Sequence, residues 1–132
     1  MPSDRQKNSS HSEPRRTVLI VDDQADVAET GAEMLAFLGY DATTANSATE
    51  ALDLLVAGTR VDILFLDIGM RSGMSGLDLA LIARERFPKI AVLLTTGHGD
   101  ALVEAREKGF EVLPKPYFVA SLREAFARLA QR

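Results

Sequence analysis

The 132-residue sequence contains no cysteine and no tryptophan, and only 6% of its residues are aromatic. Without cysteine it can form no disulfide, zinc–thiolate site or thiol nucleophile. No apolar run approaches the roughly 20 residues that a membrane-spanning helix needs, and the N-terminus lacks the apolar stretch of a secretory signal. We therefore expect a soluble, cytoplasmic protein with a core built from aliphatic side chains.

The sequence also has no excess of positive charge; its formal net charge is −4. Nucleic-acid binding depends on Lys and Arg contacts to phosphates, so we expect no nucleic-acid partner. The first 16 residues are the exception, since they carry four Lys/Arg against two acidic residues, together with two Pro and four Ser. Such a segment cannot bury enough apolar surface to offset the entropy of ordering. We predict a disordered tail over residues 1–16 and one domain over residues 17–132.

The rest of the chain alternates between apolar runs and helical patterns. Three runs, at 18–21, 63–66 and 91–94, are apolar at every position, which is typical of parallel strands buried on both faces. Weaker runs at 41–45 and 111–113 predict edge strands. Five apolar stripes at helical spacing lie between and after them, marked by Val27/Gly31/Leu35/Leu38, Ala48/Ala51/Leu52/Leu55, Leu77/Leu81/Phe87, the segment 100–108 and Leu122/Phe126/Leu129.

Several residues predict where these helices begin and end. Ser47 and Glu50 have the spacing of a capping box, and Gly39 and Gly109 are placed as helix stops. Five strand–helix repeats with right-handed crossovers favour an α/β fold. We predict a doubly wound, five-stranded parallel sheet of flavodoxin-like order 2-1-3-4-5, with five helices on two faces.

Carboxylates follow two strands that this order makes neighbours. Asp22 and Asp23 follow the first strand, and Asp67 ends the third. Ligands of open parallel sheets bind beyond the carboxyl ends of the strands, where these three side chains would meet. Carboxylates so close together repel one another unless a cation lies among them. Mg²⁺ fits best, because it prefers oxygen ligands and keeps several waters.

Two further residues complete a set suited to phosphoryl transfer. Thr96, which precedes Gly97 at the end of the fourth strand, offers a hydroxyl, and Lys115 follows the fifth strand with an ammonium for a phosphate oxygen. Each residue also has a purely structural interpretation: capping for the aspartates, and a loop position for Lys115. We interpret His98, in the adjacent Gly-His-Gly turn, as a loop residue.

Taken in order, these residues resemble the receiver domain of two-component response regulators over about residues 17–130. The resemblance implies that Asp67 accepts a phosphoryl group from a phosphohistidine. It also implies roles for the surrounding residues: Mg²⁺ binding by Asp22, Asp23, Asp67 and the Gly69 carbonyl, a phosphoryl contact from Thr96, pairing of Lys115 with Asp67 or its phosphate, and a cis Lys115–Pro116 bond.

The same resemblance implies partners. The phosphodonor would be a histidine kinase or histidine phosphotransfer protein, the downstream target an unknown protein, and the chain itself a monomer or weak dimer. Its chemistry would be limited to its own phosphorylation and dephosphorylation. The Lys-Pro-Tyr ending is similar to receivers attached to hybrid histidine kinases and to some stand-alone relatives, and Met1 and the terminal helix favour a stand-alone protein.

Other functions are less well matched. Asp22-Asp23-Gln24-Ala25 lacks the Asp-x-Asp of haloacid-dehalogenase-type phosphatases and the Gly-rich turn of a dinucleotide site. The remaining alternative is a receiver-fold binding module that works without regulated phosphorylation. Two departures from the receiver pattern bear on signalling. Val112 stands where an aromatic residue often reports the movement of the threonine, and the fourth helix is short. We nevertheless predict that phosphorylation biases the surface of the fourth helix, fifth strand and fifth helix.

Overall fold

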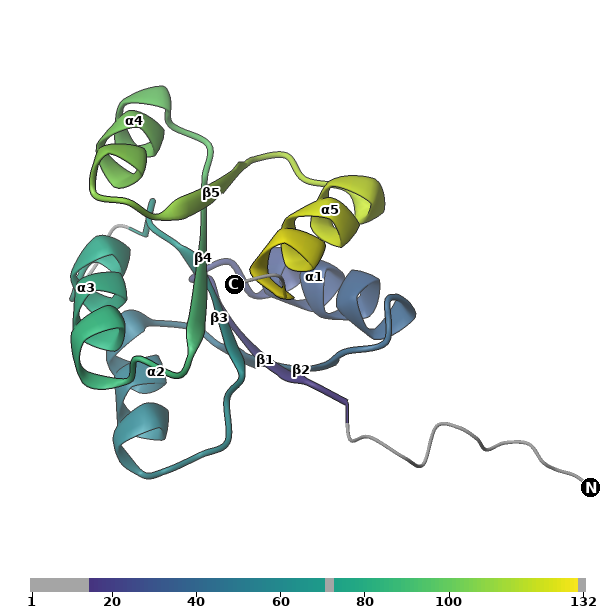
Figure 1. Cartoon of the computed structure of the whole chain (residues 1–132), viewed down its shortest axis with the longest axis horizontal. Helices are drawn as coiled ribbons and strands as arrows, with labels where there is room; N and C mark the ends of the chain where they lie inside the picture. The colour runs from purple at the N-terminus through teal and green to yellow at the C-terminus, as the bar shows by residue number, and fades with distance from the viewer. Residues whose placement is uncertain (1–14, 71–72, 131–132) are drawn as a thin grey trace, which may run out of the picture.

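The computed structural model of the chain describes residues 15–70 and 73–130. It contains one parallel sheet of order β2-β1-β3-β4-β5, as predicted (Figure 1). The strands are β1 (Thr17–Val21), β2 (Asp41–Ala45), β3 (Ile63–Asp67), β4 (Ala91–Thr96) and β5 (Glu111–Pro114). The helices between and after them are α1 (Ala25–Phe37), α2 (Ala48–Val56), α3 (Gly76–Arg86), α4 (Gly99–Glu107) and α5 (Val119–Ala130). The predicted fold class and both edge strands are confirmed.

The helices cover both faces of the sheet, α1 and α5 on one and α2, α3 and α4 on the other (Figure 1). This arrangement creates two hydrophobic cores. The core under α1 and α5 takes Ile63 and Phe65 from β3, while the core under α2, α3 and α4 takes Leu64 and Leu66. Alternate residues of one strand thus enter different cores, because successive side chains of a strand point to opposite faces. The unbroken apolar runs of the sequence follow from this double burial.

The helix ends largely match their sequence signals. Ser47 Oγ accepts a hydrogen bond from the Glu50 N–H at 3.0 Å, and the Glu50 carboxylate accepts one from the Asn46 N–H at 2.8 Å. The capping box therefore forms, with its return bond displaced by one residue. Gly39 and Gly109 adopt φ values of +99° and +89°, which glycine tolerates without steric cost. They follow the ends of α1 and α4.

The third helix differs from its predicted stripe. Leu77, Leu81 and Phe87 are only half-buried, and the fully buried residues of the helix include Leu79 and Ala80 instead. The start of the helix approaches β3 closely. A Cβ at Gly76 would lie 2.5 Å from the Asp67 carbonyl oxygen, so only glycine permits this contact. Leu79, Ala80 and Ala83 are buried in the core, and Leu77 and Leu81 are partly buried and pack against it.

The predicted tail falls mostly outside the described residues, since only Arg15 and Arg16 belong to them. The Arg16 carbonyl accepts a hydrogen bond from the Asp41 N–H at 3.0 Å, and the Arg15 guanidinium lies 3.8 Å from the Asp41 carboxylate. The domain boundary remains a prediction. Within residues 15–70 and 73–130, none of the helices combines the length and apolar character needed to cross a membrane.

Candidate functional site

Three aspartates converge at the carboxyl ends of β1 and β3. The two strands are neighbours, with Val21 opposite Leu66, so the residues that follow them lie side by side. Asp22, Asp23 and Asp67 each place one carboxylate oxygen within 4.8 Å of the others. Asp22 and Asp67 are buried, and Asp23 is exposed. The sequence prediction that the strand order gathers these side chains at one edge agrees with this geometry.

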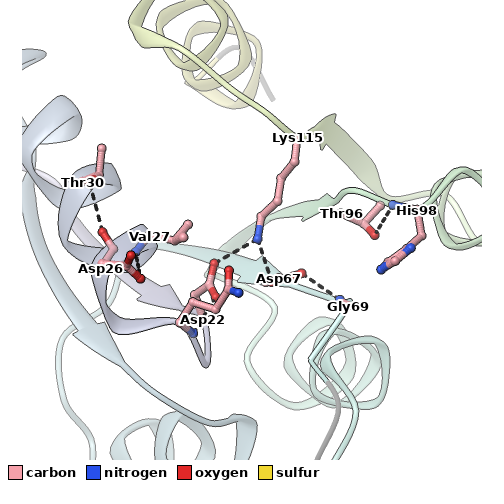
Figure 2. Close-up of polar contacts among 10 residues, drawn as sticks. Asp22, Asp26, Val27, Thr30, Asp67, Gly69, Thr96, His98 and Lys115 are labelled. Atoms are coloured by element: carbon pink, nitrogen blue, oxygen red, sulfur yellow. Dashed lines mark hydrogen bonds and ion pairs between the residues drawn. The ribbon is translucent and has the colours of Figure 1, made fainter.

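Lys115 lies between two of the three carboxylates (Figure 2). Its Nζ is 2.9 Å from Asp67 Oδ2 and 3.1 Å from Asp22 Oδ2. The Lys115 N–H donates to the Thr96 carbonyl at 2.9 Å, which attaches the start of this loop to β4. The Lys115–Pro116 peptide bond is cis, as the resemblance implied. The sequence anticipated the contact with Asp67, whereas the equal contact with Asp22 appears only in the structure.

The charges of these groups perturb one another. Burial raises the pKa of Asp22, and the neighbouring Asp67 carboxylate raises it further, against the lowering effects of the Gln24 N–H and Lys115. Burial by itself lowers the pKa of Lys115, but its hydrogen bonds and charge interactions with Asp67 and Asp22 outweigh burial and leave the pKa raised. The ammonium is therefore firmly charged at neutral pH. Ionised Asp22, by contrast, is disfavoured until further positive charge is present.

The first helix is not capped by these aspartates. Gln24 occupies the N-cap position of α1, and its side chain makes no capping hydrogen bond. Asp22 Oδ1 instead accepts a hydrogen bond from the Gln24 N–H at 2.9 Å, which fixes the turn between β1 and α1. This turn leaves the other Asp22 oxygen directed at Lys115. The capping interpretation of Asp22 and Asp23 does not account for their position.

The opposite side of the site is built from Gly69, Thr96 and His98. The Gly69 N–H donates to Asp67 Oδ1 at 2.7 Å, and Thr96 Oγ1 accepts a hydrogen bond from the His98 N–H at 3.1 Å (Figure 2). A Cβ at Gly69 would lie 3.2 Å from Asp67 Oδ1 and 3.7 Å from Thr96 Oγ1. Thr96 therefore borders Asp67. The Oγ1 of the neighbouring Thr95 is buried and has no hydrogen-bond partner among the described residues.

A cavity of about 560 Å³ opens over Asp67. Its lining includes Asp23, Lys115, Gly69 and also His98, whose imidazole lies 3.4 Å from the position of a Cβ at Gly69. Sequence reasoning treated His98 as an ordinary loop residue. Its position two residues after Thr96, at the N-cap of α4, is the signal that could have placed it at the cavity.

The donor set of the cavity suits a hard divalent cation. It offers three carboxylate oxygens within 4.8 Å of one another, two of them from carboxylates paired with Lys115, and oxygen donors of this kind are those that Mg²⁺ prefers. Asp22, Asp23 and Asp67 are the residues that would hold such an ion. The contribution of the Gly69 carbonyl stays a prediction.

Comparison with known proteins gives one family. Residues 18–127 match the response regulator receiver domain. The chain is 34% identical over 104 residues to the nitrogen assimilation regulatory protein NtrX of Azorhizobium caulinodans, covering 76% of this chain and 23% of that protein. It is 41% identical over 107 residues to the response regulator receiver protein Anae109_2439 of an Anaeromyxobacter species, covering 79% of this chain and 44% of that protein. The chain thus spans less than half the length of these curated relatives.

Solved structures of receiver proteins have the same fold as this chain. A response regulator receiver domain protein from Clostridium thermocellum superposes with a TM-score of 0.79 at 28% identity, covering 89% of this chain and 95% of the other. The response regulator TrrA from Thermotoga maritima, in complex with Mg²⁺-BeF, gives a TM-score of 0.78 at 29% identity, covering 86% and 98%. The three aspartates and the lysine at the edge of the sheet therefore stand within a known architecture, and the chain belongs to the response regulator receiver domain family of two-component signal transduction.

Proposed function

We propose that this chain is a phospho-receiver that accepts a phosphoryl group on Asp67 and signals through protein contacts. The observation that carries the proposal is the Lys115 bridge: one ammonium pairs with Asp67 at 2.9 Å and with Asp22 at 3.1 Å beside a third carboxylate. A purely structural cluster has little use for three carboxylates around a single cation. A phosphoryl-transfer site needs this excess negative charge to bind Mg²⁺.

Asp67 acts as the nucleophile in the proposed reaction. A lone pair on its carboxylate oxygen forms a bond to the phosphorus of a phosphohistidine while the P–N bond breaks. The electron pair of that bond returns to the donor imidazole, which takes up a proton. Mg²⁺, held by Asp22, Asp23, Asp67 and the Gly69 carbonyl, would supply positive charge against the carboxylates and the phosphoryl oxygens.

Residues around Asp67 then hold the product. Lys115 exchanges a carboxylate partner for a phosphoryl oxygen, and the Thr96 hydroxyl, next to Gly69, donates to another. The proposed phosphodonor is a histidine kinase or a histidine phosphotransfer protein acting in the cytoplasm. The proposed output is binding to a downstream protein. No reaction on an external substrate is proposed.

Phosphorylation by acetyl phosphate in the presence of Mg²⁺ tests this function. We expect the intact protein to gain the mass of one phosphoryl group, and the gain to disappear in Asp67→Asn and in excess chelator. Asp53→Asn is the matched control, because Asp53 is an exposed aspartate on α2. A folded protein that binds neither phosphoryl group nor beryllofluoride would contradict the proposal and favour a binding module that works without phosphorylation.

A further inference from the structure

Tyr117 connects the phosphorylation site to helix α1. It lies two residues after Lys115 in the loop between β5 and α5, and its side chain points inward, so that the residue is only 9% exposed. The Tyr117 ring packs on Phe65 with ring centroids 5.2 Å apart. Phe65 in turn precedes Asp67 by two residues on β3 and points to the same face of the sheet. Tyr117 is thus joined to the acceptor aspartate through Lys115 and through Phe65.

Gly31 is the residue of α1 that receives the far end of this ring. A Cβ at Gly31 would lie 2.9 Å from the Tyr117 hydroxyl oxygen and 3.8 Å from its Cε1. The hydroxyl therefore fills the space that a side chain at this position would take. The contact with the helix is made by the hydroxyl more closely than by the ring carbons. A shift of Tyr117 cannot occur without changing its contact with α1.

Phosphorylation of Asp67 changes the contacts of Lys115, the residue from which the connection to Tyr117 begins. The Lys115 ammonium is shared between the Oδ2 atoms of Asp22 and Asp67. These carboxylates also belong to the candidate cation site, and a phosphoryl group on Asp67 adds new anionic oxygens within reach of the ammonium. Lys115 must then exchange hydrogen-bond partners. Tyr117 lies only two residues after Lys115, in the same loop.

The other face of β5 offers no comparable aromatic group. Val112 is 3% exposed and packs into the core under α2, α3 and α4. Its side chain has no polar atom, and it has no ring that could move between two positions. Among the described residues of β5 and the loop that follows it, Tyr117 is the buried aromatic residue next to the site.

We propose that Tyr117 is a positioning residue that transmits the state of Asp67 to α1, so that the groove between α1 and the β5–α5 loop responds to phosphorylation. This inference rests on the proposed function. The groove has a volume of about 540 Å³ and is lined on the α1 side by Val27, Thr30 and Met34. It shares Gln24, Gly97 and Lys115 with the cavity over Asp67. Figure 2 shows Val27 and Thr30 on α1, across from Lys115.

Amide chemical shifts of the full chain, recorded with and without Mg²⁺ and beryllofluoride, test this connection. In the wild type we expect shifts at the site, around Gly69 and Thr96, and also along α1 around Gly31. In Tyr117→Phe the α1 shifts should be largely lost while the site shifts remain, because the missing hydroxyl leaves a gap against Gly31. Site shifts without α1 shifts, or α1 shifts unchanged by Tyr117→Phe, would overturn the inference. No shift anywhere would overturn the proposed function and this inference with it.

A double-mutant cycle tests the contact independently of phosphorylation. A Gly-to-Ala change within a helix ordinarily raises stability. In the wild-type background Gly31→Ala should give a lower urea midpoint than this gain predicts, because its Cβ clashes with the Tyr117 hydroxyl oxygen. In the Tyr117→Phe background the ordinary gain should return, because the clashing oxygen is gone. Gly99→Ala on α4 is the control, since a Cβ there meets no atom within 4 Å. Its effect should be the same with Tyr117 or phenylalanine. Equal effects of Gly31→Ala in both backgrounds would refute the proposed contact.

Discussion

Replacing Asp22 by asparagine should stabilise the protein when no divalent cation is present. The Asp22 side chain is 3% exposed, and burial together with the Asp67 carboxylate raises its pKa. A carboxyl group whose pKa is raised on folding binds its proton more tightly in the folded state. Its ionised form at neutral pH therefore costs free energy of folding. The amide has the same size and no charge, and its oxygen still accepts the Gln24 N–H; its NH2 group replaces the oxygen that accepted from Lys115, which keeps Asp67 as its partner.

The size of the effect follows from the distances. Two like charges about 4.8 Å apart, the upper limit of the separation between these carboxylate oxygens, repel by about 3.5 kcal/mol at an effective dielectric constant of about 20, and Asp22 meets this repulsion from the buried Asp67. Its attraction to Lys115 at 3.1 Å is worth about 5 kcal/mol on the same scale. The attraction therefore exceeds the repulsion by about 2 kcal/mol before screening by water in the open cavity, but burial of the carboxylate opposes its ionisation more strongly and leaves the pKa of Asp22 raised. We expect the free energy of unfolding to rise by about 1 kcal/mol, which raises Tm by about 4 °C.

Urea unfolding at low ionic strength, with chelator and with Mg²⁺, measures both sides of this prediction. In chelator, wild-type stability should fall as the pH rises from the ordinary aspartate pKa of 3.8 through the raised pKa of Asp22, and Asp22→Asn should flatten that decline. With Mg²⁺ the wild type should gain stability because the cation binds only the folded state, while the variant gains little.

Asp53→Asn serves as the control, because this aspartate is exposed on α2 and belongs neither to the carboxylate cluster nor to the lining of the cavity over Asp67. It should alter neither the pH dependence nor the response to Mg²⁺. An Asp22→Asn variant that is less stable than the wild type in chelator would refute the electrostatic argument. So would a variant that gains as much from Mg²⁺ as the wild type does.

Three further substitutions have defined outcomes. Gly76→Ala places a Cβ 2.5 Å from the Asp67 carbonyl oxygen, so it should cost about 1–3 kcal/mol in urea unfolding and slow phosphorylation by acetyl phosphate, whereas Gly99→Ala should do neither. Lys115→Gln leaves two buried carboxylates unpaired and should lower metal-free stability by about 2 kcal/mol; a gain in stability would contradict the bridge. Gly69→Asn inserts a side chain beside Asp67 Oδ1 and should change the half-life of the phosphorylated protein, and an unchanged half-life would exclude a role for this position.

Much of the fold could be predicted from the sequence because its signals are local. A strand buried on both faces must be apolar at every position, as in β3, and a parallel sheet must place the residues after its strands at one edge. The meeting of Asp22 and Asp67 follows from these two facts and the strand order. The helix stop at Gly39 is equally local, because its positive φ favours glycine.

What the sequence did not reveal depends on contacts between distant segments. Lys115 and Asp22 are separated by 93 positions, and no local pattern predicts that the ammonium bridges two carboxylates. The half-burial of Leu81 and the close approach of Gly76 to β3 are likewise properties of packing between distant segments. The same is true of Gly31, which looks like an apolar-stripe position and proves to be the place where the Tyr117 hydroxyl fits.

The alternation of residues along β3 and β4 has a consequence for how such a protein can diverge. Phe65 and Asp67 share the face covered by α1 and α5, whereas Leu94 and Thr96 share the face covered by α2, α3 and α4. Repacking one helical layer therefore adjusts Asp67, and repacking the other adjusts Thr96. Under the proposed function, the lifetime of the phosphorylated state and the response to it would be separately tunable by substitutions far from the site. A lineage could retain the same acidic chemistry while changing its timing through one layer and its choice of partner through the other.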